Sequence, residues 1–503
     1  MVTTTRSSRT WTCEKDAWGN NVRCVDPLGG EVSFAYNSNG KPARISANGT
    51  ATTFEYDDAG NQTALVDPDA GRTEYTYSAD GKILSQMDAR GVETVSTYDA
   101  AGRIASVKSG DMLTSYAYVN SGNGVNQLAK VTADGGSVEY DYDEFGRKAR
   151  ETRNIFGQGS YVFGFTYNDA GQLSETTYPG GLKVSHSYDK YGFLTSSMAN
   201  GQKVFSLLYD NGMEAKWCFD NKLCTSRLHD DKGYPKTYSL LKEDEETGQQ
   251  GQKPGVQVPR EALDRMSTSF DYSNGNLFLR QRIGESGDRF DYDGLDRLTR
   301  VYAKSGIPMD MSYDVNGNIA TKSGIGAYSY SSMRPHAVFS VDNSNRVIPT
   351  TTMSASYNGI NRVSSLSDQE HGTMHFTYGP DGQRWTTQLR KDGKMVRTIV
   401  YAGDYEKVTK NGVIREFYYL DGNAIVIKQN GTFSSYVAFT DYQGNILSVF
   451  DENANKVFDA EYDPWGKQTI RMNTIGLIRG YTGHEMLGDF DVINMNGRLY
   501  DPV

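Results

Sequence analysis

The stretch Tyr98-Asp99-Ala100-Ala101-Gly102-Arg103-Ile104 contains the pattern on which the fold depends. An aromatic residue is followed by an acidic residue, two variable residues and a glycine. An aspartate at the start of a turn accepts hydrogen bonds from backbone amides, and a glycine at its end tolerates a positive φ. This order is typical of a type I turn with a bulge, which joins two antiparallel strands as a hairpin.

The same pattern returns along most of the chain at a nearly constant interval. From Tyr36 to Tyr98, successive tyrosines that precede a turn lie 20, 21 and 21 residues apart. A fixed period of this kind predicts a repeat architecture. The residues that we assign to the structural repeat are Tyr56, Asp57, Gly60, Tyr98, Asp99, Gly102, Tyr142, Asp143, Gly146, Tyr313, Asp314 and Gly317.

The residues around each turn predict two short strands per repeat. Aromatic and polar residues alternate before the turn, as in Phe54-Glu55-Tyr56, which indicates a strand with one buried face. An aliphatic residue often follows the tyrosine by six positions, and we expect it to pack against that tyrosine across the hairpin. Examples are Ile83, Ile104, Leu173, Leu194, Leu298, Ile319 and Val363. Because a single hairpin is marginally stable in water, the units must stack into one long sheet.

The composition favours a thin, partly wet structure over a thick apolar core. The chain has 503 residues, of which 37 % are hydrophobic, 34 are tyrosine and 53 are glycine. A formal net charge of −10 and a pI near 5.3 argue against a nucleic acid as a native partner. The first residues contain no apolar run, so no signal peptide is visible, and no stretch approaches the length of a membrane span.

The four cysteines do not predict a disulfide framework. If Asp16 faces Asn20 in a simple hairpin, Cys13 faces Arg23, and the sulfurs of Cys13 and Cys24 point to opposite faces of the sheet. Cys218 and Cys224 face each other across a turn in one alignment, but we expect reduced thiols in both pairs.

The repeat signature fades between residues 211 and 270. The polar, glycine-rich stretch at about 242–258 is expected to be an exposed, mobile loop. The segment 258–266 begins with a proline after its first residue and is the best helix candidate of the chain. Tyr209 and Tyr272 are separated by three times 21 residues, so the sheet is expected to continue beneath the insertion.

These units resemble the YD repeats of Rhs proteins, bacterial polymorphic toxins related to the shell of insecticidal Tc complexes and to the barrel of teneurins. Two later segments are more specific: Arg334-Pro335-His336-Ala337-Val338, and the region from Tyr462-Asp463-Pro464-Trp465-Gly466 onward, which resembles the Rhs core-associated region. The residues that carry this closing-region motif are Pro335, His336, Asp463, Pro464, Gly466, Gly483, His484, Glu485, Gly497, Arg498, Tyr500, Asp501 and Pro502.

The resemblance implies an all-β fold in which YD-repeat hairpins spiral into a large hollow shell or barrel, with a small closing region at the C-terminus. It divides the chain into an N-terminal segment (1–30), a repeat array (31–210), divergent repeats with the insertion (211–270), a second array (271–430) and the closing region (431–503). In relatives, self-cleavage at paired Asp-Pro-x-Gly motifs frees a C-terminal toxin. Here Asp463-Pro464-Trp465-Gly466 has no partner motif at the family's position, so no cleavage residue is assigned, and we expect a shell without its toxin.

Other chemistry is weakly supported. His371 and His375 share a strand face but have no third ligand nearby, so no metal site and no cofactor are predicted. The turn aspartates do not have the alternating oxygen ligands of a calcium loop. We read His484-Glu485 as a structural corner and His336 as a buried, hydrogen-bonded residue.

Two classes of function remain. The first is a non-enzymatic shell that encapsulates a C-terminal toxin and helps to deliver it, with an immunity protein and a secretion apparatus, such as the type VI system, as further partners. Delivery would follow a leaderless route out of the cell. The alternative is a cell-surface adhesin or carbohydrate-binding protein, in which exposed tyrosines stack on sugars. An enzyme is not expected.

Overall fold

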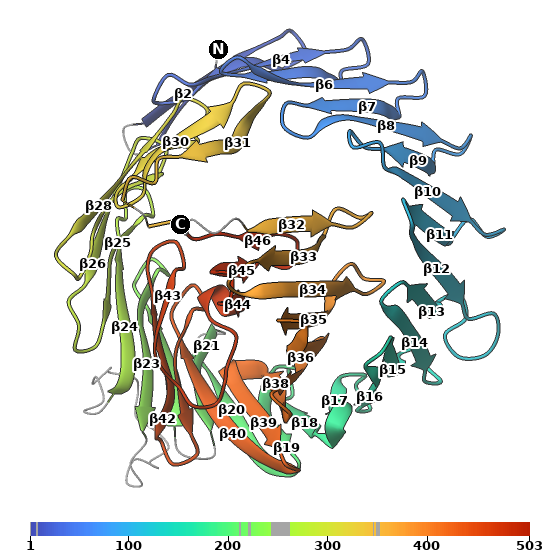
Figure 1. Cartoon of the computed structure of the whole chain (residues 1–503), viewed down its shortest axis with the longest axis vertical. Helices are drawn as coiled ribbons and strands as arrows, with labels where there is room; N and C mark the ends of the chain where they lie inside the picture. The colour runs from blue at the N-terminus through green and yellow to red at the C-terminus, as the bar shows by residue number, and fades with distance from the viewer. Residues whose placement is uncertain are drawn as a thin grey trace. The chain divides into compact units, whose positions relative to one another are not determined.

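The computed structural model describes residues 2–6, 9–210, 213–219, 223–242, 262–345, 347–348 and 353–503. The contacts within the chain divide it into two compact units. Unit 1 consists of Met1–Asp111 and Thr268–Thr350, and unit 2 consists of Met112–Ser267 and Thr351–Val503. Each unit is described by itself below (Figure 1).

Unit 1 contains two arrays of short antiparallel strands. The first array comprises β1 (Val2–Arg6), β2 (Arg9–Lys15), β3 (Asn21–Val25), β4 (Glu31–Tyr36), β5 (Pro42–Ala47), β6 (Thr50–Tyr56), β7 (Gln62–Asp67), β8 (Gly71–Tyr77), β9 (Ile83–Met87), β10 (Glu93–Tyr98) and β11 (Ile104–Ser109). The second comprises β25 (Leu277–Arg282), β26 (Asp288–Tyr292), β27 (Leu298–Tyr302), β28 (Pro308–Tyr313), β29 (Ile319–Lys322), β30 (Gly326–Ser331) and β31 (Arg334–Val341).

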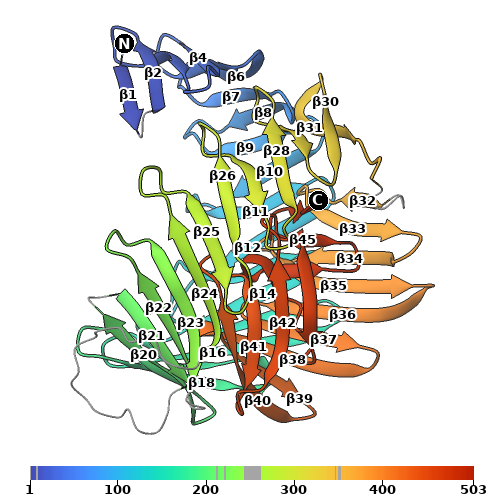
Figure 2. The ribbon, with the colours of Figure 1, turned by 90° about the vertical axis from the view of Figure 1, so that its left-hand side faces the viewer.

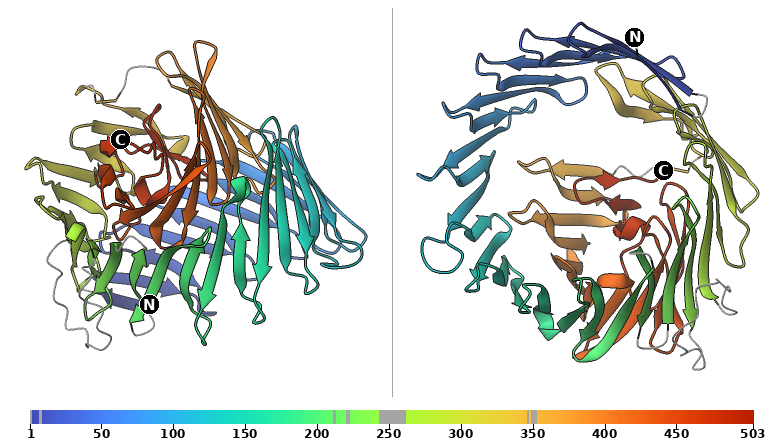
Figure 3. Two further views of the ribbon diagram at one scale, coloured as in Figure 1. Left: turned by 90° about the horizontal axis from the view of Figure 1, so that it is seen from below. Right: turned by 180° about the vertical axis from the view of Figure 1, so that it is seen from behind.

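Unit 2 also contains two runs of strands. The first run comprises β12 (Met112–Tyr118), β13 (Leu128–Ala133), β14 (Gly136–Tyr142), β15 (Lys148–Ile155), β16 (Gly159–Tyr167), β17 (Leu173–Thr177), β18 (Lys183–Tyr188), β19 (Leu194–Ala199), β20 (Gln202–Asp210), β21 (Met213–Phe219), β22 (Leu223–His229), β23 (Pro235–Lys242) and β24 (Ala262–Phe270), with the short 3₁₀ helix η1 (Pro179–Gly181). Figure 3 shows its teal and green strands as one row of hairpins.

The second run of unit 2 begins with a sheet of twelve strands and ends with a small sheet of three. The twelve strands are β32 (Ser354–Tyr357), β33 (Val363–Asp368), β34 (Gly372–Tyr378), β35 (Arg384–Lys391), β36 (Lys394–Ala402), β37 (Tyr405–Lys410), β38 (Val413–Leu420), β39 (Ala424–Gln429), β40 (Thr432–Thr440), β41 (Ile446–Asp451), β42 (Lys456–Tyr462) and β43 (Gln468–Asn473), with η2 (Asp421–Asn423). The last elements are η3 (Tyr481–Gly483), β44 (Glu485–Leu487), β45 (Val492–Asn494) and β46 (Leu499–Tyr500). Figure 2 shows β33–β37 side by side.

Strands that follow one another in the chain pair antiparallel, as β9, β10 and β11 do. The all-β class and the array of hairpins predicted from the sequence are therefore confirmed. The strands β20 to β24 also continue the sheet through the region where the signature fades. No helix among the described residues has the length and hydropathy of a membrane span.

The apolar core lies in unit 2. Its large cluster contains side chains from both runs of strands, such as Phe205 and Trp217 from the first and Phe417 and Phe439 from the second. Rings from the two runs touch: the Tyr178 and Tyr418 centroids are 5.9 Å apart. In the described part of unit 1, the buried apolar side chains are Ala64, Phe290, Val301, Met311 and Ile325. Unit 1 is thus built mainly of half-exposed strands.

The predicted helix is wrong where the structure describes it. Residues 262–266 form the start of β24, in which Asp264, Met266 and Thr268 are buried and alternate with more exposed residues. This period of two fits a strand against the core and overrides the local helix signal. The residues 243–261, and with them most of the predicted loop, lie outside the described part of the chain.

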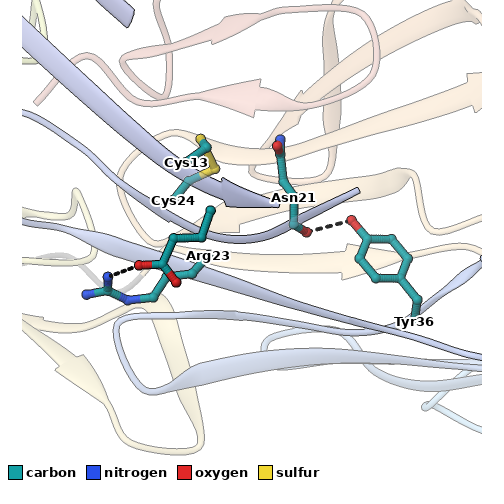
Figure 4. The surroundings of a disulfide bond; sticks show 6 residues. Cys13, Asn21, Arg23, Cys24 and Tyr36 are labelled. Carbon is teal, nitrogen blue, oxygen red and sulfur yellow. Dashed lines mark hydrogen bonds and ion pairs between the residues drawn. A yellow bond between two sulfur atoms is a disulfide. The ribbon is translucent and has the colours of Figure 1, made fainter. Parts of the chain in front are cut away.

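The prediction of reduced thiols is also wrong, because both cysteine pairs form disulfides. Asp16 pairs with Asn20 as expected, but a bulge beside Lys15 shifts the register by one residue. Cys13 therefore lies directly opposite Cys24, with their Cα atoms 4.1 Å apart (Figure 4). Cys218 and Cys224 are opposed in the same way on β21 and β22.

Candidate functional site

The repeat turn has the predicted geometry. At residues 98–104, the Asp99 amide donates to the carbonyl of Arg103, and the Gly102 amide donates to the carbonyl of Asp99. Asp99 Oδ1 accepts the amides of Ala101 and Arg103, both at 2.9 Å. Gly102 has a φ of +77°, which an L-residue adopts only at a cost. The bulge between Thr97 and Tyr98 makes Tyr98 the direct partner of Ile104.

The turn aspartate also binds the side chain that follows the glycine. Asp99 Oδ2 accepts a hydrogen bond from Arg103 Nε at 2.8 Å, and this side-chain bond is the main reason why the pKa of Asp99 is lowered. Arg147 makes the equivalent bond to Asp143 at 2.7 Å. The guanidinium of Arg147 then lies 4.5 Å from the ring centroid of Tyr167 in the next repeat, a cation–π contact that links neighbouring hairpins.

The tyrosine hydroxyl makes a second link between repeats, which the sequence analysis missed. The Tyr98 hydroxyl donates to the carbonyl of Ile83, the aliphatic residue of the preceding repeat, at 2.8 Å. The same bond joins Tyr313 to Leu298 and Tyr378 to Val363. A constant separation of 15 residues between a tyrosine and an aliphatic residue was the available signal. Because a phenylalanine cannot make this bond, it explains why tyrosine precedes the turn.

The remaining predicted repeat residues occupy equivalent positions. Tyr56 and Tyr142 donate to the carbonyls of Pro42 and Leu128. The other members of this set accept or donate the turn hydrogen bonds, or adopt the positive φ that the turn needs: Asp57, Gly60, Asp143, Gly146, Asp314 and Gly317. We define these turns, with their tyrosines, as the repeat turns.

The last thirty residues, 474–503, leave the twelve-stranded sheet and pack on it through β44–β46. We call them the closing segment. Leu487, Phe490 and Val492 of this segment form an apolar cluster with side chains of the sheet, including Leu366 and Met374. The closing segment therefore shares a small core with the strands β33 to β35.

A buried ion pair fastens the closing segment to β35. Arg384 and Glu485 are both buried, and Arg384 Nη1 lies 3.2 Å from Glu485 Oε2. The Tyr401 hydroxyl donates to Glu485 Oε1, and Asn494 Nδ2 donates to Oε2 at 3.1 Å. Burial, followed by the charge of Glu485, raises the pKa of Tyr401 well above its usual value.

A second pair lies beside the first. Arg479 Nη2 is 2.7 Å from Oε1 of the buried Glu406, and the Tyr419 hydroxyl donates to Glu406 Oε2 at 2.8 Å. Burial raises the pKa of Glu406, Arg479 acts in the opposite direction, and the nearby Glu485 raises it further. Two further arginines bind the closing segment from the sheet: Arg397 contacts Asp489, and Arg362 donates to the carbonyl of Gly497.

These paired groups line a polar cavity of about 380 Å³ in unit 2. Its walls include Arg384, Glu406, Arg479 and Glu485. The arginines and glutamates alternate and neutralise one another, so the cavity presents no net excess of either charge. This arrangement positions the closing segment, and we assign it no catalytic role.

The predicted closing-region residues fall into two groups. Pro335 and His336 lie on β31 in unit 1, whereas all the others lie in unit 2. His336 is hydrogen-bonded as predicted, to Asp69, but its side chain is 42 % exposed, so the prediction of a buried histidine is wrong. It lies at the tip of a hairpin of a thin sheet, where no second layer covers it.

The residues from 463 to 502 do lie near one another in sequence and in the closing segment or the turn before it. Asp463 accepts turn amides from Trp465 and Lys467, and a side chain at Gly466 would overlap the Tyr481 ring. Tyr500 stacks on Tyr481, with centroids 6.5 Å apart. The other predicted residues of this group make turn or backbone contacts, or contribute to the segment's surface: Pro464, Gly483, His484, Gly497, Arg498, Asp501 and Pro502. Arg384, Tyr401, Glu406 and Arg479 were missed, because their partners are distant in sequence.

Comparison with known proteins gives the same reading of the repeats. The family model "Teneurin YD-shell" matches residues 43–196. No curated protein matches the chain. Among solved structures, TcdB2-TccC3 without its hypervariable C-terminal region has a TM-score of 0.74 at 13 % identity, covering 99 % of this chain and 32 % of that one. The Photorhabdus luminescens Tc holotoxin pore with the mutation TccC3-D651A gives 0.75 at 13 %, with the same coverages.

TcdB2-TccC3 itself gives a TM-score of 0.73 at 14 % identity, covering 99 % of this chain and 33 % of that one. The chain thus spans about a third of the length of the solved structures that it matches. These matches confirm the predicted resemblance to YD-repeat proteins and show a common fold.

Proposed function

We propose that this YD-repeat protein is a non-enzymatic shell that encloses a toxin polypeptide and carries it toward a target cell. The observation that carries the proposal is the fold match, which extends over 99 % of the chain to Tc toxin components at a TM-score of 0.74. One of those structures is described as lacking a hypervariable C-terminal region, and another is described as TcdB2-TccC3-Cdc42. A variable C-terminal passenger on a constant repeat scaffold is the arrangement that we infer for this chain.

The wall chemistry is suited to containment. Each hairpin is joined to the next by ladder hydrogen bonds, by the tyrosine hydroxyl and by the cation–π contact, so few backbone groups are left for a passenger to pair with. The buried pairs Arg384–Glu485 and Arg479–Glu406 hold the closing segment without needing a passenger. A scaffold of this kind is stable whether it is loaded or empty.

The finer steps belong to the same proposal. We infer an interbacterial toxin as cargo, an immunity protein in the producing cell, and export by a leaderless route such as the type VI system. The rival adhesin function is less well supported, because the hydroxyls of the repeat tyrosines are already bound to backbone carbonyls. These rings are therefore fixed within the wall.

Protease protection tests the proposal. A small reporter domain is fused after Val503, and the fusion is treated with a nonspecific protease under native conditions. If the chain encloses its passenger, the reporter is degraded at least about tenfold more slowly than the same reporter mixed with the chain in trans. Equal rates would contradict encapsulation. Binding of defined glycans by the unfused chain, together with equal rates, would favour the adhesin.

A further inference from the structure

The two arrays of unit 1, residues 1–111 and 268–350, meet at the tips of their hairpins. The ladders run within each array, as between β6 and β7 or between β26 and β27. The contacts between the arrays come instead from side chains in turns. We call this line of contacts the seam.

Four contacts form the seam in the first array's order. Arg9 pairs with Asp296 and donates to the carbonyl of Asp293 at 3.2 Å. Leu28 packs so closely on Gly294 that a Cβ there would lie 2.9 Å from it. The remaining two contacts are the Asn48 amide group with the carbonyl of Val315 at 2.7 Å, and Asp69 with the backbone amide of His336 at 2.9 Å and with its ring.

The seam follows the period of the repeat. Leu28, Asn48 and Asp69 are 20 and 21 residues apart, and their partners Gly294, Val315 and His336 are 21 residues apart. Each repeat of the first array therefore meets one repeat of the second. Such matching over consecutive repeats indicates a built interface, since unrelated surface contacts would not keep one register.

The seam is nevertheless the weakest line in unit 1. The ladder between β6 and β7 joins four residue pairs, and one tyrosine hydroxyl per repeat adds to it. Across the seam, each repeat contributes one or two hydrogen bonds between partly exposed groups. The side chains of Asp69 and His336 are 30 % and 42 % exposed. Hydrogen bonds of this kind contribute about 1 kcal/mol each, or less.

The first contact is reinforced from one side. Arg9 and Cys13 are on the same strand, β2, and the Cys13–Cys24 disulfide ties this strand to β3 (Figure 4). The Tyr36 hydroxyl donates to the carbonyl of Asn21 on β3 at 2.8 Å, which extends the tie to β4. The edge of the first array is thus held together as one body when the contacts of Arg9 break.

We propose that unit 1 opens along the seam as a cooperative door, with both arrays staying folded. The opening itself follows from the contacts within unit 1. Its use as an exit for a passenger rests on the proposed function. Because the opening is measured below on the chain without a passenger, its failure and the failure of encapsulation are distinguishable.

The test removes two contacts and observes a third. In the variant Arg9→Ala/Asn48→Gly, the Asp69–His336 contact is left unchanged. Glycine is chosen at position 48 because Asn48 has a φ of +49°, which alanine would strain. The matched control is Asn200→Gly in unit 2, since Asn200 has the same φ and accepts the Lys183 amide as Asn48 accepts the Glu31 amide.

The readout is amide hydrogen exchange at His336 and in the β6–β7 ladder. If the seam opens as a unit, the His336 amide exchanges about tenfold faster in the double variant, and the ladder amides stay protected. The control leaves both unchanged. The proposal is overturned if the His336 amide keeps its original rate, or if the ladder amides accelerate with it, which would mean that the array unfolds. Acceleration in the Asn200→Gly control would also overturn it.

Discussion

Units 1 and 2 are built from the same hairpin but are stabilised differently. In unit 1, side chains are mostly half-exposed, and the repeat turns, the tyrosine hydroxyls and one disulfide hold a thin wall. In unit 2, the same hairpins face a second run of strands across a large apolar cluster. The comparison teaches that the YD signature specifies the hairpin and its stacking, whereas burial depends on whether another layer covers the sheet.

The largest expected effect is the loss of an aromatic side chain from the core of unit 2. Phe417 is fully buried, so Phe417→Ala should lower the free energy of unfolding of unit 2 by about 3–5 kcal/mol. The matched change in unit 1 is Phe339→Ala, where the ring is 78 % exposed, and it should cost less than about 0.5 kcal/mol. Denaturant titration followed by hydrogen exchange measures both. Similar costs would contradict the difference between the units.

Removing one member of a buried ion pair should come next. Glu485→Gln leaves the buried Arg384 without its counter-charge, at a cost of about 3–5 kcal/mol. We expect limited proteolysis to cut first within the closing segment. In unit 1, Glu55→Gln removes a partner of the exposed Arg72 and should leave the cleavage pattern unchanged. An intact closing segment in Glu485→Gln would argue that the apolar cluster alone holds it.

The two disulfides should differ in their access to reductant. Cys13 and Cys24 are half-buried at an edge of unit 1, whereas Cys224 is fully buried in unit 2. Under native conditions, dithiothreitol followed by alkylation should label Cys13 and Cys24 first. Replacing this pair with serines should destabilise β1–β3 by about 2–3 kcal/mol, since the loop that it closes is short. Earlier labelling of Cys218 and Cys224 would reverse the order that burial predicts.

The tyrosine hydroxyl should contribute equally in the two units. Tyr98→Phe in unit 1 and Tyr378→Phe in unit 2 each remove one bond to a carbonyl of the preceding repeat. We expect about 1 kcal/mol for each. Local hydrogen exchange at Ile104 and Arg384, their partners across the hairpin, provides the measurement. A cost in only one unit would show that this bond is not a general property of the repeat.

The smallest expected effect is a difference in acid sensitivity. The pKa of Asp99 is lowered in the folded state, so its contribution to stability is present above its unfolded pKa and is lost as the pH falls through the folded value. The pKa of the buried Glu406 is raised, so protonation as the pH falls favours the folded state. Between about pH 4 and pH 2, exchange should therefore rise in unit 1 before unit 2. The opposite order would show that the turn carboxylates contribute little.

The local fold could be predicted from the sequence because its determinants lie within one repeat. Tyr98, Asp99, Gly102 and Ile104 occupy the predicted places, and the type I turn with its bulge is present. The disulfide at Cys13 was missed because that bulge was not carried into the pairing of the first hairpin. Applied there, it shifts the register by one residue and brings the two cysteines together.

Contacts between distant segments could not be predicted in this way. Glu485 was recognised as a member of a motif, but its partner Arg384 lies 101 positions earlier and has no marked sequence context. The strand at 262–266 was mistaken for a helix because its burial depends on β41, where Ser448 donates to Asp264. Such pairings depend on how the sheets pack, which a single sequence does not encode locally.

The central claim is that this array of YD hairpins encloses a polypeptide, and the position of a passenger tests it most directly. Single-particle cryo-electron microscopy of the chain fused to a reporter after Val503 would reveal that position. We predict density for the passenger that is surrounded by the β wall and absent from the unfused chain. A reporter tethered outside the wall, with an interior identical to that of the unfused chain, would contradict the account.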